Sequence, residues 1–297
     1  MIKIKNIVLV AIVSILIYAC SASNPLADNF DHEAQALADK DTLVKYLSNH
    51  YYDSTIDSIK PITTGKTALI NDPKLKSQNI TEKIGDIDID FKLYYYVANE
   101  GNPSPAKGFP TLLDSVLVNY HLDYLIDATL IQEGQDLNTA TWFDPANIAV
   151  KGWLYGFTHF KGGKNITSNG PITYENGGKG VLIIPSGLAY RNLDNNGSIP
   201  INSNLIYYIN LFDIVENTDH DNDGLASYLE IEDASEESDP FKVDTDGDFI
   251  PNYRDADDDN DGVPTIKEDT NGDGDPRNDF SDPSNPTLPD YLNPKIK

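Results

Sequence analysis

The chain has 297 residues, of which 39% are hydrophobic and 23% are charged, and its formal net charge is -25 at pH 7. This length allows one to three domains with apolar cores. The acidic charge argues against a nucleic-acid-binding protein, because no basic stripe is available to neutralise phosphates. The single cysteine excludes a disulfide scaffold and a four-cysteine zinc site. Residues 216–297 hold 25 acidic and 6 basic residues, so most of the negative charge lies in this segment.

The first 19 residues predict a signal peptide. Two lysines precede an apolar run over residues 7–19, which is too short for a comfortable membrane span. Residues 17–20, Ile-Tyr-Ala-Cys, resemble the lipobox of bacterial lipoproteins, in which the cysteine becomes the lipidated first residue of the mature chain. The resemblance implies a lipid on Cys20 and a location in the bacterial cell envelope, facing the periplasm or the cell surface. An ordinary secretory signal with a chance cysteine is the alternative.

Hydrophobic spacing then predicts the secondary structure in chain order. Residues 28–52 have apolar positions near helical spacing. Residues 87–97 alternate between apolar and polar types, which is typical of a half-buried strand. Further strands are predicted at residues 116–124, 180–184 and 205–214, with one short helix at residues 152–160. Several antiparallel strands around one short helix indicate the α+β class.

Three sequence blocks in the middle of the chain occur in a characteristic order. Residues 150–153 read Val-Lys-Gly-Trp, residues 184–190 read Ile-Pro-Ser-Gly-Leu-Ala-Tyr, and residues 199–207 read Ile-Pro-Ile-Asn-Ser-Asn-Leu-Ile-Tyr. They resemble the blocks V-x-G-W, I-P-x-x-L-A-Y and I-P-x-N-x-x-L-x-F of the FKBP-type peptidyl-prolyl cis-trans isomerases. The resemblance covers residues 111–216 and implies an FKBP-like antiparallel sheet wrapped around one short helix.

The activity that this resemblance implies is rotation about the peptide bond before proline, which has a barrier of about 18–20 kcal/mol. An apolar, aromatic-walled pocket suits this reaction, because desolvating the imide weakens its resonance as the bond twists. No cofactor is needed for it. The resemblance places six residues in the pocket: Tyr120, Val150, Trp153, Tyr190, Ile199 and Tyr207. Trp153 corresponds to the floor, Val150 to a backbone donor, and Tyr190 to the hydroxyl that holds the ligand carbonyl.

One departure from the family pattern concerns a wall of this pocket. Ten residues after Tyr120 the family usually has Phe-Asp, whereas this chain has Leu130 and Ile131. If the strand in this region has a different bulge, we expect Asp127 or Asp136 to substitute for the missing carboxylate.

Two further departures lie outside that wall. Residues 161–179 insert a polar, Gly-rich loop, and Arg191 occupies a position that is usually glycine.

Tyrosine and tryptophan also commonly pack in the cores of β-rich domains. A module that binds proline-containing chains without catalysis is therefore the alternative to an enzyme.

The acidic segment repeats the calcium-loop pattern D-x-D-x-D-G-x₅-E. Residues 219–230 fit it at every position, residues 257–268 repeat it, residues 244–255 have Asp at the last place, and residues 269–275 begin a fourth, incomplete loop. Calcium needs six to eight oxygens at about 2.3–2.6 Å, which alternating carboxylates around a tight turn can supply. The predicted ligands are Asp219, Asp221, Asp223, Glu230, Asp244, Asp246, Asp248, Asp255, Asp257, Asp259, Asp261 and Glu268.

Long flanking helices, which an EF-hand requires, are not evident in this segment. The tandem loops are more similar to thrombospondin type 3 repeats, and this resemblance implies structural Ca²⁺ ions with little apolar core around them. A solvated, disordered acidic tail is the alternative.

The sequence thus predicts five parts. They are a lipoprotein signal peptide (1–19), a tether with an N-terminal helix and strand extension (20–110), the FKBP-like isomerase domain (111–216), the calcium repeats (217–282) and a loose C-terminal tail (283–297). The expected function is peptidyl-prolyl isomerisation of extracytoplasmic protein chains. The expected partners are proline-containing polypeptides and a membrane that holds the lipid anchor, and no nucleic acid is expected.

Overall fold

The computed structural model describes residues 30–125, 127–128, 131–193, 197–232 and 239–297. The predicted signal peptide, Cys20 and Leu130 lie outside the described residues. All elements named below belong to one unit, His32–Lys297. Within the described ranges, no helix has both the length and the apolar character needed to cross a membrane.

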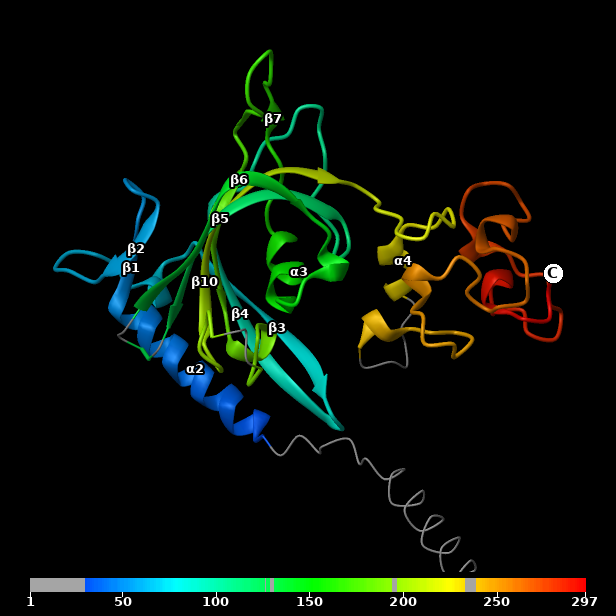
Figure 1. Cartoon of the computed structure of the whole chain (residues 1–297), viewed down its shortest axis with the longest axis horizontal. Helices are drawn as coiled ribbons and strands as arrows, with labels where there is room; N and C mark the ends of the chain where they lie inside the picture. The colour runs from blue at the N-terminus through cyan, green and yellow to red at the C-terminus, as the bar shows by residue number, and fades with distance from the viewer. Residues whose placement is uncertain (1–29, 126, 129–130, 194–196, 233–238) are drawn as a thin grey trace, which may run out of the picture. The chain divides into compact units, whose positions relative to one another are not determined.

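Six strands form one antiparallel sheet in the order β3-β4-β9-β10-β5-β6 (Figure 1). The strands are β3 (Leu75–Ile84), β4 (Ile87–Asn99), β5 (Ser115–Leu125), β6 (Ile131–Phe143), β9 (Gly178–Ile184) and β10 (Asn204–Val215). The four strands expected from hydrophobic spacing are confirmed as β4, β5, β9 and β10. The structure also confirms the α+β class with antiparallel strands.

The sequence did not reveal the two edge strands, β3 and β6. The sequence of β6 is mostly polar and contains a glycine, so it lacks the alternation that marks a half-buried strand. It is a strand because it pairs with β5, and two register shifts interrupt that pairing. Because β3 and β4 precede residue 111, dividing the chain there cuts through a single sheet.

Helix α3 (Lys151–Phe157) packs against the sheet, which curves around it in Figure 1. Two glycines one turn apart allow this close approach. A Cβ on Gly152 would lie 2.4 Å from the side chain of Ile184, and one on Gly156 would lie 2.6 Å from that of Leu182. The helix predicted at residues 152–160 is confirmed, and its contact with β9 depends on these two positions.

Helix α2 (His32–Asn49) covers the opposite face of the sheet and confirms the helix expected between residues 28 and 52. Its Leu43, Tyr46 and Leu47 join a core that includes Val181 and Ile183 of β9. The alternate residues of β9, such as Leu182, face the core around α3. Both faces of the sheet are therefore covered, which explains why residues 181–184 read as a continuous apolar run.

A buried carboxylate connects α2 to the loop after β9. Asp39 of α2 accepts hydrogen bonds from the backbone N–H of Ser186 (2.9 Å) and from its hydroxyl (2.6 Å). Burial raises the pKa of Asp39, and the bonds from Ser186 oppose that rise. Since Ser186 lies in the turn that leads to Tyr190, helix α2 helps to hold this candidate pocket residue in place.

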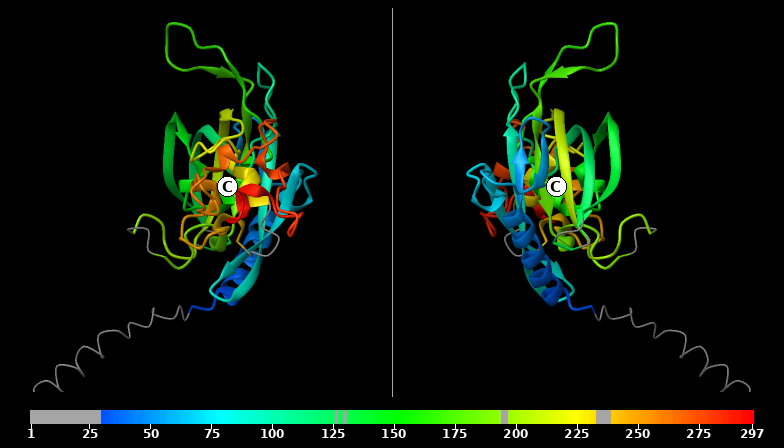
Figure 2. Two further views of the ribbon diagram at one scale, coloured as in Figure 1. Left: turned by 90° about the vertical axis from the view of Figure 1, so that its right-hand side faces the viewer. Right: turned by 90° about the vertical axis from the view of Figure 1, so that its left-hand side faces the viewer.

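Two small hairpins lie outside the main sheet. One consists of β1 (His50–Asp53) and β2 (Ser58–Pro61), and the other of β7 (Lys164–Asn165) and β8 (Tyr174–Glu175). The second hairpin forms the insertion at residues 161–179 and projects away from the sheet (Figure 2).

The acidic segment is built from turns rather than long elements. It contains α4 (Ser227–Glu232) and short 3₁₀ turns, and further 3₁₀ turns occur earlier in the chain. The 3₁₀ turns of the described chain are η1 (Leu69–Asn71), η2 (Pro145–Asn147), η3 (Ser186–Leu188), η4 (Pro240–Lys242), η5 (Asn252–Arg254), η6 (Thr265–Lys267), η7 (Pro276–Asn278) and η8 (Asp290–Leu292).

The C-terminal residues 283–297, expected to be loose, are instead packed. Asp290, Tyr291 and Asn293 are buried, and the ammonium of Lys297 bonds the carbonyl oxygen of Asp261. The expectation was wrong because this segment also bonds carboxylates and backbone groups of residues 279–282, which no hydrophobic pattern signals.

Candidate functional site

Trp153 of α3 is the centre of an aromatic cluster on the concave face of the sheet. Its ring meets those of Tyr120 of β5 at 5.2 Å and Tyr207 of β10 at 5.1 Å, edge to face. Tyr120 and Tyr207 are themselves 5.1 Å apart. The structure therefore brings together three candidate pocket residues from three separate elements.

The remaining candidates surround this cluster. Val150 and Ile199 are buried in the same core, and Tyr190 packs against it while half-buried. Trp153 is only 4% exposed, and its buried indole N–H has no acceptor among the described residues. The indole of Trp153 thus forms an apolar floor whose N–H donor has no partner in the described chain. The half-buried Tyr120 and Tyr190 border it.

The tyrosine hydroxyls gather at one side of the cluster. Burial raises the pKa of Tyr207, and the adjoining Tyr190, which is hydrogen-bonded to it, adds to the rise. Burial also raises the pKa of Tyr120, again with a contribution from Tyr190. The phenols therefore stay protonated near neutral pH and can donate to a carbonyl oxygen.

Aromatic rings from other positions pack against Trp153, although the chain has Leu130 and Ile131 where the family usually has Phe-Asp. Leu130 lies outside the described residues, and Ile131 packs with the core beneath α2 on the other face. Phe143 at the end of β6 and Phe157 of α3 each lie 5.2 Å from Trp153. The family-like blocks do not include either residue, although the aromatic residue that ends the β6 segment was a usable signal.

One of the two suggested substitute carboxylates, that of Asp136, has its partner outside the cluster. Asp136 bonds His121, whose ring lies 5.5 Å from that of Tyr208 on the side covered by α2. Asp127 is exposed. Arg191, at the position that is usually glycine, adopts a left-handed backbone with φ of 55°. The loop thus keeps the conformation for which glycine is suited.

Four loops of the acidic segment share one backbone conformation. The fourth and sixth positions of every loop have positive φ, at Asn222 and Gly224, Gly247 and Phe249, Asn260 and Gly262, and Gly272 and Gly274. In every loop the sixth N–H donates to the first aspartate, with distances from 2.7 to 3.2 Å. The loop that begins at Asp269 therefore belongs to the same series, although its sequence is incomplete.

The first three loops gather the predicted ligands. Carboxylate oxygens lie within 4.8 Å of one another in three sets: Asp219, Asp221 and Asp223; Asp244, Asp246 and Asp248; and Asp257, Asp259 and Asp261. The closing residues Glu230, Asp255 and Glu268 each interact electrostatically with the aspartates of their own loop.

A fourth set joins two loops. Asp223 and Glu230 of the first loop lie within 4.8 Å of Asp258, which precedes Asp259 in the third loop. The calcium pattern does not predict Asp258 as a ligand, because this residue falls between two positions of the pattern. Its position next to Glu230 arises only when the two loops fold together.

The buried oxygens test whether a cation fits these loops. Both carboxylate oxygens of Glu230 and of Glu268, and one of Asp258, are buried without a hydrogen-bond partner in the described chain. Burial and neighbouring carboxylates raise the pKa of Glu230 to about 10, of Asp258 to about 9 and of Glu268 to about 8. Unpaired buried carboxylates are strongly destabilising. Hard oxygens that converge in this way fit Ca²⁺.

No family model matches the chain, and none of the curated proteins matches it. Among solved structures it is similar to FkpA from Escherichia coli, with 25% identity and a TM-score of 0.31 over 42% of this chain and 48% of FkpA. The chain thus spans about half the length of FkpA. It is also similar to a peptidyl-prolyl cis-trans isomerase from Pseudomonas syringae pv. tomato, with 14% identity and a TM-score of 0.37 over 64% of this chain and 100% of that one. Both TM-scores are low.

Proposed function

We propose that the sheet domain is a peptidyl-prolyl cis-trans isomerase that acts on extracytoplasmic protein chains. The observation that carries the proposal is the cluster of Tyr120, Trp153 and Tyr207, with Trp153 at its base and the hydroxyl of Tyr190 at its edge. Three of these residues, Trp153, Tyr190 and Tyr207, come from the three family-like sequence blocks, which are distant along the chain, and Tyr120 comes from β5.

The chemistry follows from what each side chain offers. A proline ring that packs on Trp153 removes its imide from water, and in the apolar surroundings the twisted state, which has less charge separation, is favoured over the planar one. Tyr190 donates its hydroxyl to the carbonyl oxygen of the ligand and keeps the peptide oriented. Val150 and Ile199 complete the apolar wall. No group needs to change its protonation state.

The replacement Tyr190→Phe tests this assignment by NMR exchange of a short proline peptide. Losing one hydrogen bond of about 1 kcal/mol predicts a fall in kcat/KM of roughly five- to tenfold. Tyr51→Phe is the matched control, because Tyr51 lies in the β1–β2 hairpin and donates to Asp53 instead. Unchanged turnover in a folded Tyr190→Phe protein would remove Tyr190 from the pocket.

The alternative is a module that binds proline-containing chains without catalysis. The observation that favours it is the deep burial of Trp153 and Tyr207, at 4% and 3% exposure. Peptide binding without accelerated exchange in the unmodified protein would establish this function.

We further propose that the acidic loops bind Ca²⁺ as a structural ion. The unpaired oxygens of Glu230, Glu268 and Asp258 support this. Calorimetric titration of the full chain with CaCl₂ should release or absorb heat, and Glu230→Gln should weaken the affinity about tenfold or more. Glu216→Gln is the control, since Glu216 accepts a bond from Gly108 outside the loops. No heat, together with an unchanged circular dichroism spectrum, would rule the ions out.

The location is also a proposal. Cys20 is taken as the lipidation point, which would attach the protein to a membrane of the bacterial envelope and bring the domain near secreted chains. Metabolic labelling with a fatty-acid analogue tests it, and loss of label in Cys20→Ser is the expected result.

A further inference from the structure

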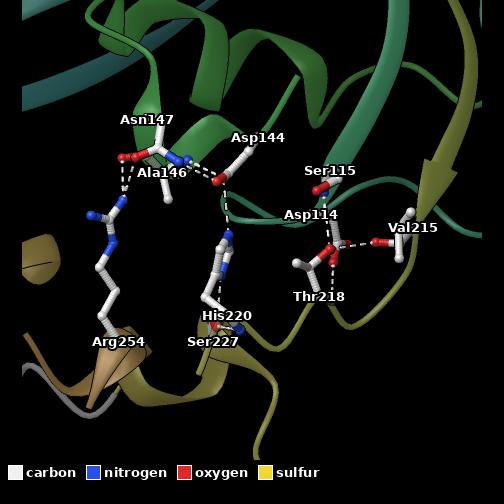
Figure 3. Close-up of polar contacts among 10 residues, drawn as sticks. All are labelled: Asp114, Ser115, Asp144, Ala146, Asn147, Val215, Thr218, His220, Ser227 and Arg254. Carbon is white, nitrogen blue, oxygen red and sulfur yellow. Dashed lines mark hydrogen bonds and ion pairs between the residues drawn. The ribbon is translucent and has the colours of Figure 1, made fainter. Parts of the chain in front are cut away.

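Two side chains of the acidic segment bond the turn at residues 144–147, next to the candidate pocket (Figure 3). His220 of the first loop places one ring nitrogen 2.9 Å from Oδ1 of Asp144 and the other 2.8 Å from the hydroxyl of Ser227. Arg254 donates to the carbonyl oxygen of Ala146 at 3.0 Å and to Oδ1 of Asn147 at 2.7 Å. Two side chains of the acidic segment thus hold residues 144–147 from two directions.

Apolar packing and a further ion pair support the same contact. Leu113 of the sheet domain forms a small core with Ile231 and Tyr253 of the acidic segment, and Ala146 packs against it. In α3, the ammonium of Lys151 lies 3.4 Å from Oδ2 of Asp239. The acidic segment therefore contacts the turn and the beginning of the pocket helix.

Residues that line the pocket flank this turn on both sides. Phe143, one residue before Asp144, meets Trp153 edge to face. Val150 and Trp153 follow three and six residues after Asn147. The 144–147 turn is thus the chain segment that connects two walls of the pocket, and its position affects both.

The two contacting side chains lie inside the proposed calcium loops. His220 stands between Asp219 and Asp221, and Arg254 directly precedes Asp255. The mixed set of Asp223, Glu230 and Asp258 connects the loop that carries His220 to the region that follows Arg254. An ion at this set would tie the first loop, which carries His220, to Asp258, which lies four residues after Arg254, and so would hold both contacts.

Another contact has no such dependence. Thr218 donates its backbone N–H to Oδ1 of Asp114 at 3.0 Å, and its hydroxyl accepts from the N–H of Ser115 at 3.0 Å (Figure 3). Thr218 precedes the first ligand in the chain. This contact can persist without ions and act as the hinge about which the loops dock.

We propose that Ca²⁺ held by Asp223, Glu230 and Asp258 docks the acidic loops onto residues 144–147 and so regulates the Trp153 pocket. Without the ion, the acids of the mixed set are buried with oxygens that have no partner in the described chain, which is destabilising, and the loops separate. His220 and Arg254 then leave the turn, and Phe143 and Val150 lose their support. The inference rests on the proposed calcium sites and, for its effect on turnover, on the proposed isomerase.

The test uses the full chain carrying Trp142→Phe, which leaves Trp153 as the only tryptophan. Three quantities are measured as CaCl₂ is added: the fluorescence of Trp153, hydrogen exchange of residues 143–153, and kcat/KM for a proline peptide. We expect a fluorescence change, slower exchange and a rise in kcat/KM of about fivefold, a usual size for coupling between sites.

The double variant His220→Ala with Arg254→Ala should remove these three responses while calorimetry still shows calcium binding. Arg277→Ala is the matched control, because Arg277 pairs with Asp275 inside its own loop. It should respond as the parent protein does.

Suppose that calorimetry shows calcium binding, but neither the fluorescence of Trp153 nor the hydrogen exchange of residues 143–153 changes. This result would overturn the inference and leave the calcium sites standing. Absence of calcium heat would overturn it together with those sites. If the protein has no isomerase activity, the fluorescence and exchange responses still decide whether the docking occurs.

Discussion

The sheet domain and the acidic segment bury opposite kinds of side chain. The interior around α3 consists of apolar residues such as Leu182 and Ile184, which are fully buried. In the acidic segment the buried residues are mainly polar, and they include Glu230, Asp258 and Glu268. One region is stabilised by removal of apolar surface from water, whereas the other buries carboxylates, which cations would neutralise if the proposed calcium sites exist.

The buried carboxylates of the two regions show the same contrast. In the sheet domain, Asp39 is bonded by Ser186, Asp114 by Thr111 and Thr218, and Glu82 by Lys151. The described chain offers no donor to either oxygen of Glu230 or Glu268. A buried acid that has protein donors reflects internal packing, and one without them indicates an external ligand.

Removing divalent cations should separate the two regions most clearly. With EDTA, the acidic segment should lose its structure, because oxygens of its buried acids are left without a cation or a hydrogen-bond partner in the described chain, while the sheet core persists. A ligand present at a hundred times its Kd adds about 2.7 kcal/mol per site to the free energy of unfolding. Removing it from several sites should therefore lower that free energy by a large amount. Limited proteolysis with mass spectrometry should show new cuts within residues 217–297. Identical cutting with and without EDTA would contradict the contrast.

A cavity in the apolar core should destabilise the sheet domain. Leu182→Ala removes a fully buried side chain beneath Gly156 and should lower the free energy of unfolding by about 3 kcal/mol. This loss should appear in calcium and in EDTA alike, in the denaturant transition of the sheet domain. Leu193→Ala serves as the control, because Leu193 is 60% exposed. A loss that occurs only with calcium would mean that the two cores are not independent.

The pH dependence at Asp39 sharpens the contrast within the sheet domain. Burial raises the pKa of Asp39 above its ordinary value of 3.8, so the folded state binds the proton more tightly than the unfolded one. Its contribution to stability is full below the ordinary value and is lost as pH rises through the raised pKa. Relative to Asp39→Asn, the unmodified protein should therefore lose stability across that window. A difference that does not vary with pH in denaturant titrations would refute the assignment.

The smallest effect concerns the backbone of the second loop. Phe249 has φ of 77° and is 94% exposed, whereas the first and third loops have Gly224 and Gly262 at the same place. Phe249→Gly should stabilise the calcium-bound loop by about 1 kcal/mol, because glycine adopts this conformation without strain. Phe249→Ala keeps the β-carbon and should gain little. Equal thermal shifts for the two variants would show that the exposed ring, and not the backbone, sets the cost.

The sequence by itself determined most of the sheet and the identity of the cluster. Alternation over residues 87–97 predicted β4, because a half-buried strand must separate its two faces. The spacing of Trp153 and Tyr207 within family-like blocks predicted their meeting. The repeated aspartates predicted loops with one shared conformation, because that conformation is local and uses neighbouring residues.

Only the tertiary structure decided which distant residues meet. β6 is a strand because β5 pairs with it, and Phe143 reaches Trp153 only through that pairing. Asp258 joins Glu230, and Asp290 is buried beside the third loop, through contacts between loops that have no period in the sequence. Local patterns record what a residue's neighbours in the chain require. Contacts between separate segments depend on how the whole chain closes, and for this reason His220 and Arg254 had no sequence signal.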